Sequence, residues 1–513
     1  MIADELKYRI LTSLGLVPTV EQSHAISVFA DFLCSPESLS VMVLRGSAGT
    51  GKTTLAGAIV RALSVLRQKF VLLAPTGRAA KVFSLYAGHP AYTIHRRIYR
   101  QKSSAGDAML GMGGFELNFN NMHDTLFIVD EASMISNDGM GVFGSGNLLD
   151  DLIQFVYGGQ RCRLLLIGDQ AQLPPVGAME SPALQTAVLR SYGMSVSEAN
   201  LNEVLRQASE SGILYNATAI RHASSEGVAA DTALPQVRVN GFSDVRVVPG
   251  DELIEQLATS YGRVGLDDTI VVTRSNKRAN IYNQGIRNTV LDREDQLCRG
   301  DRLMIVKNNY YWASVEERGT RNEERDCQQP QPLPPNTPSR EYSPSSFLVP
   351  PSSKIDFLAN GDVAVVQRVR NVHEQHGFHF AEVTMQFPDY DDYELTATVL
   401  LDTLTSESPS LTREQQAQLY ERVVADYADI PRKADRLKKL KEDPYYNALQ
   451  VKFAYAVTCH KAQGGQWAHV YVDQGYMTDD MLTPEYLHWL YTAFTRATEQ
   501  LFLVNWPKTQ LSD

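Results

Sequence analysis

Short apolar runs without polar alternation recur in the first part of the chain. They predict strands at Val41–Leu44, Phe70–Leu73, Thr125–Val129 and Arg163–Ile167. Strands that are buried on both faces of a parallel sheet have this pattern. Because helix-like stretches such as Leu55–Leu66 separate the runs, the sequence predicts an α/β domain with helices on both faces of its sheet.

The same pattern returns towards the C-terminus. It predicts strands at Thr269–Val272, His469–Val472 and Leu501–Val504, and helices at Lys277–Arg287 and Pro484–Thr495. We therefore expect a second parallel α/β domain, whose sequence is interrupted by a long insertion.

The insertion has different patterns. Residues 361–400 alternate as antiparallel strands do, and residues 411–442 are helical and end in a basic run from Arg432 to Lys441. Residues 328–353 are rich in Pro, Ser and Gln, which predicts a loop or disordered segment. The insertion is therefore expected to be β-rich and distinct from both α/β domains.

Composition narrows the class of protein. Hydrophobic residues make up 43% and charged residues 21% of the 513-residue chain, as in soluble globular proteins of several domains. No apolar run approaches the ~20 residues of a membrane helix, and the acidic N-terminus lacks the features of a signal peptide. Five scattered cysteines without a C-x-x-C pair argue against a disulfide framework and a zinc site. We expect a cytoplasmic protein with no membrane partner.

The charge distribution matters more than its sum. A net charge of −11 counts against a nucleic-acid partner. Residues 71–106, however, contain six Lys and Arg residues and no Asp or Glu. This segment is either a basic track for a nucleic-acid backbone or a solvated face.

The segment from Gly46 to Thr53 matches the phosphate-binding pattern G-x-x-x-x-G-K-[ST]. It lies between a predicted buried strand and a helix, where backbone N–H groups can wrap phosphate. Lys52 would reach the β- and γ-phosphates, and the Thr53 hydroxyl would ligate Mg²⁺. The residues expected to bind ATP here are Gly46, Ser47, Ala48, Gly49, Thr50, Gly51, Lys52, Thr53 and Thr54.

Polar residues at two further strand ends suit the same chemistry. Asp130 is placed to hold Mg²⁺, and Glu131 to orient or deprotonate the attacking water. Gln172 follows the next strand and could sense the γ-phosphate, unless its Pro-rich segment is a plain stiff turn.

Two arginines lie in segments of the second predicted α/β domain. Arg206 and Arg496 could each stabilise the transition state of phosphoryl transfer from a second domain. Taken alone, either could instead be a surface salt-bridge partner. We expect the catalytic set to be Lys52, Asp130, Glu131, Gln172, Arg206 and Arg496.

In their order along the chain, these motifs resemble those of superfamily 1 helicases, and within them the RecD/Dda-like group that moves 5′ to 3′; the Pif-type helicases are near neighbours. The matching segments are Thr19–Gln22, Gly46–Thr53, Ala74–Ala80, Thr93–His95, Asp130–Met134, Gly168–Pro175, Leu205–Gln207, Ala456–Gly464 and Tyr491–Ala497.

The resemblance implies two RecA-like P-loop NTPase domains with ATP between them and single-stranded DNA across both. It implies that Gln22 reads adenine. It places Pro75, Thr76, Arg78, His95, Thr458, His460 and Lys461 on or beside the DNA strand.

The resemblance also implies two additions to the motor. A pin between residues 96 and 124 would present Phe115 or Phe119 to the duplex junction, although a plain structural hairpin fits equally well. The insertion corresponds in position to an SH3-like accessory domain. Through it, replication or recombination proteins could bind.

The sequence thus predicts an α/β fold with two parallel-sheet RecA-like domains, a small pin and a β-rich SH3-like domain. The first RecA-like domain is expected at residues 1–95 and 125–195, and the second at residues 196–300 and 446–513. The pin is expected at residues 96–124, and the SH3-like domain at residues 301–445. The expected function is an ATP- and Mg²⁺-dependent DNA helicase, nucleoid-associated in a bacterium or phage, that tracks single-stranded DNA 5′ to 3′ and opens junctions. The alternatives are a translocase that strips proteins from DNA, a small-molecule P-loop kinase, and a DNA-binding scaffold with a relict ATP site.

Overall fold

The computed structural model describes residues 2–101, 115–137, 144–203, 211–225, 235–309, 311–312, 358–478 and 481–512. Contacts divide the chain into two compact units. The first comprises Met1–Asp295, Thr405–Pro409 and Phe453–Asp513, and the second comprises Gln296–Leu404 and Ser410–Lys452. The Pro-rich segment 328–353 lies outside the described residues.

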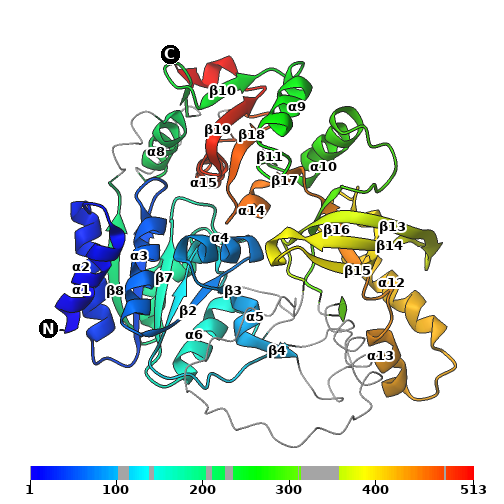
Figure 1. Cartoon of the computed structure of the whole chain (residues 1–513). Coiled ribbons are helices and arrows are strands. Elements are labelled where there is room, and N and C mark those ends of the chain that lie inside the picture. The colour runs from blue at the N-terminus through cyan, green and yellow to red at the C-terminus, as the bar shows by residue number, and fades with distance from the viewer. Residues whose placement is uncertain are drawn as a thin grey trace, which may run out of the picture. The chain divides into compact units, whose positions relative to one another are not determined.

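The first unit contains two parallel sheets, which confirms the predicted fold class (Figure 1). Within the described residues, the first sheet has six strands in the order β3-β2-β6-β7-β1-β8, all paired in parallel. Its strands are β1 (Ser40–Gly46), β2 (Lys69–Ala74), β3 (Ala91–Thr93), β6 (Thr125–Val129), β7 (Arg163–Gly168) and β8 (Ser195–Leu201). Because β8 pairs with β1, the first sheet extends beyond residue 195, where the sequence placed its boundary.

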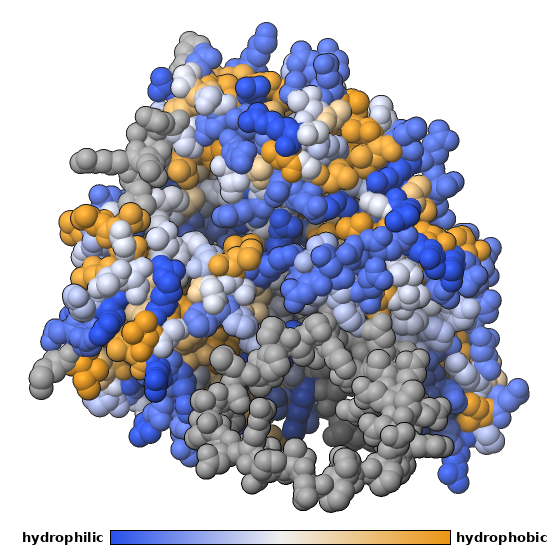
Figure 2. Space-filling view, in the orientation of Figure 1, coloured by the Kyte–Doolittle hydropathy of each residue, from blue (hydrophilic) through white to orange (hydrophobic). Residues whose placement is uncertain are grey.

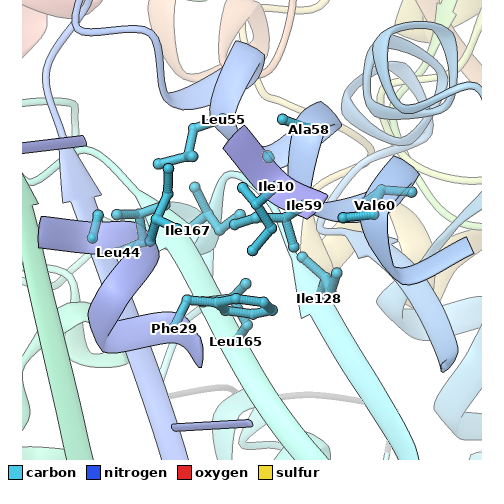
Figure 3. Close-up of a cluster of buried hydrophobic side chains, with 14 of the residues drawn as sticks. Ile10, Phe29, Leu44, Leu55, Ala58, Ile59, Val60, Ile128, Leu165 and Ile167 are labelled. Carbon is cyan, nitrogen blue, oxygen red and sulfur yellow. The ribbon is translucent and has the colours of Figure 1, made fainter. Parts of the chain in front are cut away.

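Helices cover both faces of this sheet. They are α1 (Ile2–Leu14), α2 (Val20–Cys34), α3 (Lys52–Val65), α4 (Gly77–Ala87), α5 (Ile94–Ile98), α6 (Leu148–Gly158) and α7 (Thr186–Ser191). On one face, Ile10, Phe29 and Ile59 from three helices meet Leu44 and Ile167 from two strands (Figure 3). Each such buried side chain contributes about 1.5–3 kcal/mol. This core fixes β1 and α3, the two elements that flank the phosphate loop.

The second sheet follows the order β10-β19-β18-β11-β17, again with parallel pairs only among the described strands. Its strands are β10 (Val245–Val248), β11 (Thr269–Thr273), β17 (Ala456–Thr458), β18 (Trp467–Asp473) and β19 (Ala497–Val504). The accompanying helices are α8 (Gly212–Ser225), α9 (Leu253–Arg263), α10 (Asn276–Gly285), α14 (Cys459–Ala462) and α15 (Pro484–Phe494). The strands β9 (Val237–Arg238) and β20 (Leu511–Ser512) form a small separate pair. Segments on both sides of the insertion therefore build one sheet.

A short antiparallel pair lies within the predicted pin. The strands β4 (Tyr99–Gln101) and β5 (Phe115–Leu117) pair with Arg100 opposite Glu116, and an ion pair of 2.9 Å joins these two side chains. The expected hairpin is present at its base, while residues 102–114 lie outside the described part of the chain.

The second unit is built on a closed barrel. Its strands are β12 (Arg302–Ile305), β13 (Val363–Gln375), β14 (Phe378–Phe387), β15 (Tyr393–Leu400) and β16 (Leu449–Phe453). Buried side chains such as Val366, Phe380 and Met385 fill it. The predicted helical stretch forms α12 (Arg413–Asp426) and α13 (Lys433–Lys441). Because β16 completes the barrel, this domain continues past the boundary expected at residue 445.

The surface is of mixed character. On the face shown in Figure 2, hydrophobic residues are interspersed with hydrophilic ones. Among the described residues, no helix combines the length and apolarity needed to span a membrane.

Candidate nucleotide and nucleic-acid site

The phosphate loop joins the buried strand β1 to helix α3. Gly49 and Gly51 have φ angles of 77° and 79°, which glycine adopts without strain. A Cβ atom on Gly46 would lie 2.7 Å from Cγ of Lys52, so the backbone can pass the lysine only because this residue is glycine. The loop geometry therefore depends on all three glycines of the motif.

Lys52 lies within the loop. Its ammonium group donates hydrogen bonds to the carbonyl oxygens of Gly46 and Ser47, and Nζ is 3.8 Å from Oδ2 of Asp169. The hydroxyl-bearing Thr53 and Thr54 follow in the first turn of α3 and are exposed. These groups are placed as a phosphate site requires, with a cation inside the loop and hydroxyls beside it.

Gln22 supports the loop from helix α2. Its side-chain oxygen accepts from the N–H of Thr19 at 3.1 Å in a capping box, and its Nε2 donates to the carbonyl oxygen of Thr50 at 3.1 Å. The residue expected to read adenine thus ties the start of α2 to the phosphate loop.

Asp130 and Glu131 follow directly after β6. The Tyr86 hydroxyl donates to Asp130, and the Glu131 N–H donates to the other oxygen of that carboxylate at 2.9 Å. Burial raises the pKa of both carboxyl groups, and the positive charge of Arg496 opposes this rise at Glu131. Glu131 also has a left-handed φ of 53°, a conformation that is costly for a non-glycine residue and is concentrated at functional sites.

The segment after β7 carries Asp169 and Gln172. Gln172 is 5% exposed, and its side-chain oxygen has no hydrogen-bond partner within the described residues. Buried polar atoms normally have partners, so this oxygen is available to a ligand. This supports the predicted sensing role of Gln172 without testing it.

Tyr491 connects this segment to the phosphate loop. Its hydroxyl donates to Asp169 Oδ2 at 2.6 Å and accepts from the N–H of Ala48 at 2.8 Å. Burial raises the pKa of Tyr491 well above its ordinary value, so the hydroxyl keeps its proton at neutral pH. One side chain of α15 thereby contacts two separate segments of the first sheet.

Three more side chains, from α15 and from the end of α14, contact the segment after β7. The Thr492 hydroxyl accepts from the N–H of Leu173 at 2.8 Å, and Gln463 donates to the Leu173 carbonyl at 2.6 Å. Nδ1 of His488 lies 2.8 Å from the carbonyl oxygen of Ala171. None of these side chains was predicted to have a role. Their signal was the spacing of His488, Tyr491 and Thr492, which places them on one face of a helix.

Of the two predicted catalytic arginines, only Arg496 lies within the described residues. Arg496 is buried and donates to the carbonyl oxygens of Thr492 at 3.0 Å and Gly465 at 3.2 Å. Arg206 lies outside the described residues. A third arginine, Arg221 on α8, donates to the Ser47 hydroxyl at 2.6 Å, and sequence reasoning missed it because no motif contains it.

The predicted DNA-contacting residues of the first sheet lie next to a segment of the second. Thr76, which follows Pro75, caps α4 by accepting from the N–H of Ala79 at 3.2 Å. The guanidinium of Arg78 lies 4.3 Å from the centroid of the Trp467 ring and donates to the Gln466 carbonyl at 3.1 Å. Arg78 of the basic segment 71–106 therefore contacts residues that belong to the second sheet or directly precede it.

The remaining predicted DNA contacts are half-buried. Burial lowers the pKa of His95 to about 4, so its imidazole is neutral at neutral pH. Burial also lowers the pKa of His460, and it lowers the pKa of Lys461 to about 8. Thr458 precedes these two residues at the end of β17. These groups can hydrogen-bond or pair with a phosphate, and the structure leaves that role a prediction.

The pin candidates differ in their setting. Phe119 is 71% exposed, and the guanidinium of Arg100 lies 4.8 Å from its ring centroid. Phe115 lies in strand β5. Either residue remains a candidate for the duplex junction.

Known proteins resemble this chain in two stretches. A family model described as an AAA domain matches residues 20–242, and one described as a UvrD-like helicase C-terminal domain matches residues 453–504. These stretches contain the phosphate loop and the α15 region, respectively.

Two curated relatives each match part of the chain. The ATP-dependent RecD2 DNA helicase of Deinococcus radiodurans is 31% identical over 185 residues, which are 36% of this chain and 22% of the relative. The ATP-dependent DNA helicase dda of Enterobacteria phage T4 is 28% identical over 244 residues, 44% of this chain and 50% of the relative. The chain thus spans half or less of the length of these two relatives.

Among solved structures, that of Pif1 helicase from Bacteroides in complex with ADP-AlF3 and ssDNA matches 97% of this chain and 95% of its own, with a TM-score of 0.44 and 13% identity. The two family models and these curated relatives show that the chain is similar to superfamily 1 helicases, in the group that includes RecD2 and Dda.

Proposed function

We propose that this protein is an ATP-dependent DNA helicase that moves 5′ to 3′ on single-stranded DNA and separates duplexes in the cytoplasm, at the nucleoid. One observation carries the proposal: Tyr491 of the second sheet is hydrogen-bonded to both Ala48 and Asp169 of the first. A change at the phosphate loop would be transmitted to the other domain through these two hydrogen bonds. The names of the curated relatives, both ATP-dependent DNA helicases, support DNA as the partner.

The residues around the loop suit hydrolysis of ATP. Lys52 would neutralise the β- and γ-phosphates, and Arg496 would stabilise charge that develops in the transition state. Glu131 would orient the water and accept its proton, a role that a carboxyl group with a raised pKa performs well near neutral pH. Gln172 would direct its unpartnered oxygen towards the same water or the terminal phosphate.

The residues expected to hold Mg²⁺ fit that ion. Thr53 and Asp130 supply a hydroxyl and a carboxylate, the hard oxygen donors that Mg²⁺ prefers. Both Asp130 oxygens already accept one hydrogen bond each, and a carboxylate retains further acceptor capacity. Bound Mg²⁺ would neutralise phosphate charge during transfer.

Contacts between the two sheets support the proposal that the protein moves along DNA. The segments around Thr76 and Lys461 would bind the DNA strand. The guanidinium of Arg78, near Thr76, lies over the ring of Trp467 in the second sheet. If nucleotide binding changes the hydrogen bonds of Tyr491, the segments around Thr76 and Lys461 would shift relative to each other once per cycle of ATP hydrolysis. The barrel domain is the proposed contact for replication or recombination proteins.

Unwinding assays test the proposal directly. Duplexes with a 5′ DNA tail, a 3′ DNA tail or a 5′ RNA tail would be incubated with and without ATP. We expect strand separation only from the 5′ DNA tail and only with ATP. Separation from the 3′ tail alone would overturn the polarity. ATP hydrolysis that DNA does not stimulate would favour a kinase-like enzyme, and stimulated hydrolysis with protein displacement but no unwinding would favour a stripping translocase.

A further inference from the structure

The phosphate loop has a cationic neighbour outside the family motifs. Nη1 of Arg221 lies 2.6 Å from Oγ of Ser47, the second residue of the loop. Arg221 is half-buried and belongs to α8, beyond the segment that carries Arg206. A guanidinium that reaches a phosphate loop from another domain has the position of a phosphate ligand.

The helix that carries Arg221 is well fixed. At its N-terminus the carboxylate of Asp244 accepts from the Ser211 hydroxyl at 2.7 Å and from the N–H of Gly212 at 2.8 Å. Further along, Asn216 donates to the Arg238 carbonyl at 2.8 Å and accepts from its N–H at 2.8 Å. Helix α8 also packs against α15. Its backbone can therefore hold an arginine in a defined position.

The loop residue after Ser47 is contacted from the same side. The N–H of Ala48 donates to the Tyr491 hydroxyl on α15. Two packed helices of the second domain thus contact successive residues of the loop, one through a hydroxyl and one through a guanidinium. The tyrosine cannot carry positive charge to a phosphate, whereas the arginine always can.

We propose that Arg221 contacts the terminal phosphate of bound ATP and stabilises the charge that develops on it during hydrolysis. The loop cradles the β- and γ-phosphates, so a guanidinium at Ser47 is within side-chain reach of them. A planar fork of donors binds phosphate more strongly than it binds a serine hydroxyl, so the contact would be exchanged on ATP binding. The inference rests on the proposed ATPase function.

The arginine takes no covalent part in the reaction. The water oxygen bonds to the terminal phosphorus, its proton passes to the general base, and the bond between phosphorus and the leaving oxygen of ADP breaks. ADP and inorganic phosphate are the products. Arg221 therefore acts on charge alone, and its removal should affect the transition state more than the bound product.

The test compares Arg221→Ala, Arg221→Lys and the control His222→Ala, an exposed neighbour on the same helix. For each full-length variant, the affinities for a fluorescent ADP and for ADP with aluminium fluoride would be measured, together with kcat and KM for DNA-stimulated hydrolysis. Arginine fingers contribute ~10³–10⁵ in rate, so we expect Arg221→Ala to lower kcat at least about a hundredfold. It should weaken binding of the aluminium fluoride complex similarly and leave the ADP affinity within about twofold. Arg221→Lys should be intermediate, and His222→Ala should equal the wild type.

Retained ADP affinity shows that the variant site is folded. If Arg221→Ala binds the aluminium fluoride complex normally and keeps a wild-type kcat, Arg221 is a domain-packing residue and the inference is overturned. If the wild type itself neither binds nor hydrolyses ATP, the proposed function fails and the inference fails with it. The two failures are therefore distinguishable.

Discussion

Both parallel sheets send a buried strand into a helix, but the two junctions differ in how the helix begins. At the start of α3 the N-cap is Gly51, which is left-handed and offers no side-chain hydrogen bond to the first turn. At the start of α10 the N-cap is Ser275, whose hydroxyl accepts from the N–H of Arg278 at 3.2 Å. The first turn of a helix has N–H groups without internal partners. One junction satisfies such a group with its own serine, and the other keeps its groups for an anion.

The comparison shows that a repeated strand–helix unit is not a repeated function. Both junctions follow a buried strand of a parallel sheet, yet of these two only the glycine-rich junction can wrap phosphate. The second sheet contributes through side chains that reach the first, such as Tyr491 and Arg221. Variants at the two junctions and at the contacts between the sheets would test this division of roles.

Replacement of the lysine at each junction should give the largest difference in the rate of ATP hydrolysis. Lys52→Ala should lower DNA-stimulated ATP hydrolysis at least about a hundredfold, because it removes the cation from the phosphate site. The matched control is Lys277→Ala at the start of α10, where the exposed lysine pairs with Glu407 at 3.5 Å. Exposed pairs contribute little, so its rate should stay within about twofold of the wild type. Equal loss in both variants would contradict the division.

The second sheet should bind DNA in a pH-dependent way. The pKa of Lys461 is lowered to about 8, so the free protein loses this charge as the pH rises through that value. A DNA phosphate favours the charged form, so single-stranded DNA affinity should fall about tenfold between about pH 7 and pH 9. Fluorescence anisotropy would measure it. Lys461→Arg should remove this dependence, and a wild-type affinity that is flat over the range would remove Lys461 from the DNA site.

The hydroxyl of Tyr491 should couple the sheets. Tyr491→Phe keeps the ring but leaves Ala48 and Asp169 without their shared partner, a loss of about 1–1.5 kcal/mol. Stimulation of ATP hydrolysis by single-stranded DNA should fall about five- to tenfold. The control Tyr486→Phe, on the same helix, removes a hydroxyl that donates to Gln474 within the second sheet at 2.6 Å. Stimulation that is unchanged in Tyr491→Phe, or equally reduced in both variants, would refute the coupling role.

The N-cap at the start of α10 should stabilise that helix without affecting ATP hydrolysis. Ser275→Ala removes the N-cap of α10, which typically costs about 1 kcal/mol. Hydrogen–deuterium exchange in the first turn of α10 should accelerate about fivefold. ATP hydrolysis should be unchanged. A clear loss of activity in this variant would show that the second junction also takes part in the reaction.

Local patterns predicted the longer buried strands of the two parallel sheets well. The strand expected at Thr125–Val129 has the same bounds in the structure, and the one expected at Val41–Leu44 is the centre of β1. These segments are buried on both faces, so their sequence is continuously apolar. Strand β8 was missed because four of its seven residues, Ser195, Ser197, Glu198 and Asn200, are polar. As an edge strand it is less covered, and only its pairing with β1 shows which sheet it joins.

The catalytic region was predicted unevenly for a similar reason. Lys52, Asp130, Glu131 and Gln172 follow strand ends within one domain, where the chain itself brings them together. Tyr491 and Arg221 reach the same loop from α15 and α8, and no spacing along the chain records that approach.

The phosphate loop, the two parallel sheets and the β-rich insertion could be predicted from local sequence, because periodicity and glycine placement depend on neighbouring residues. Tertiary structure alone decided which side chains of the second sheet contact that loop, and that Gln22 and Tyr86 hold groups expected to bind nucleotide and Mg²⁺. Hydrogen bonds between residues hundreds of positions apart depend on how helices pack, and packing is a property of the whole fold.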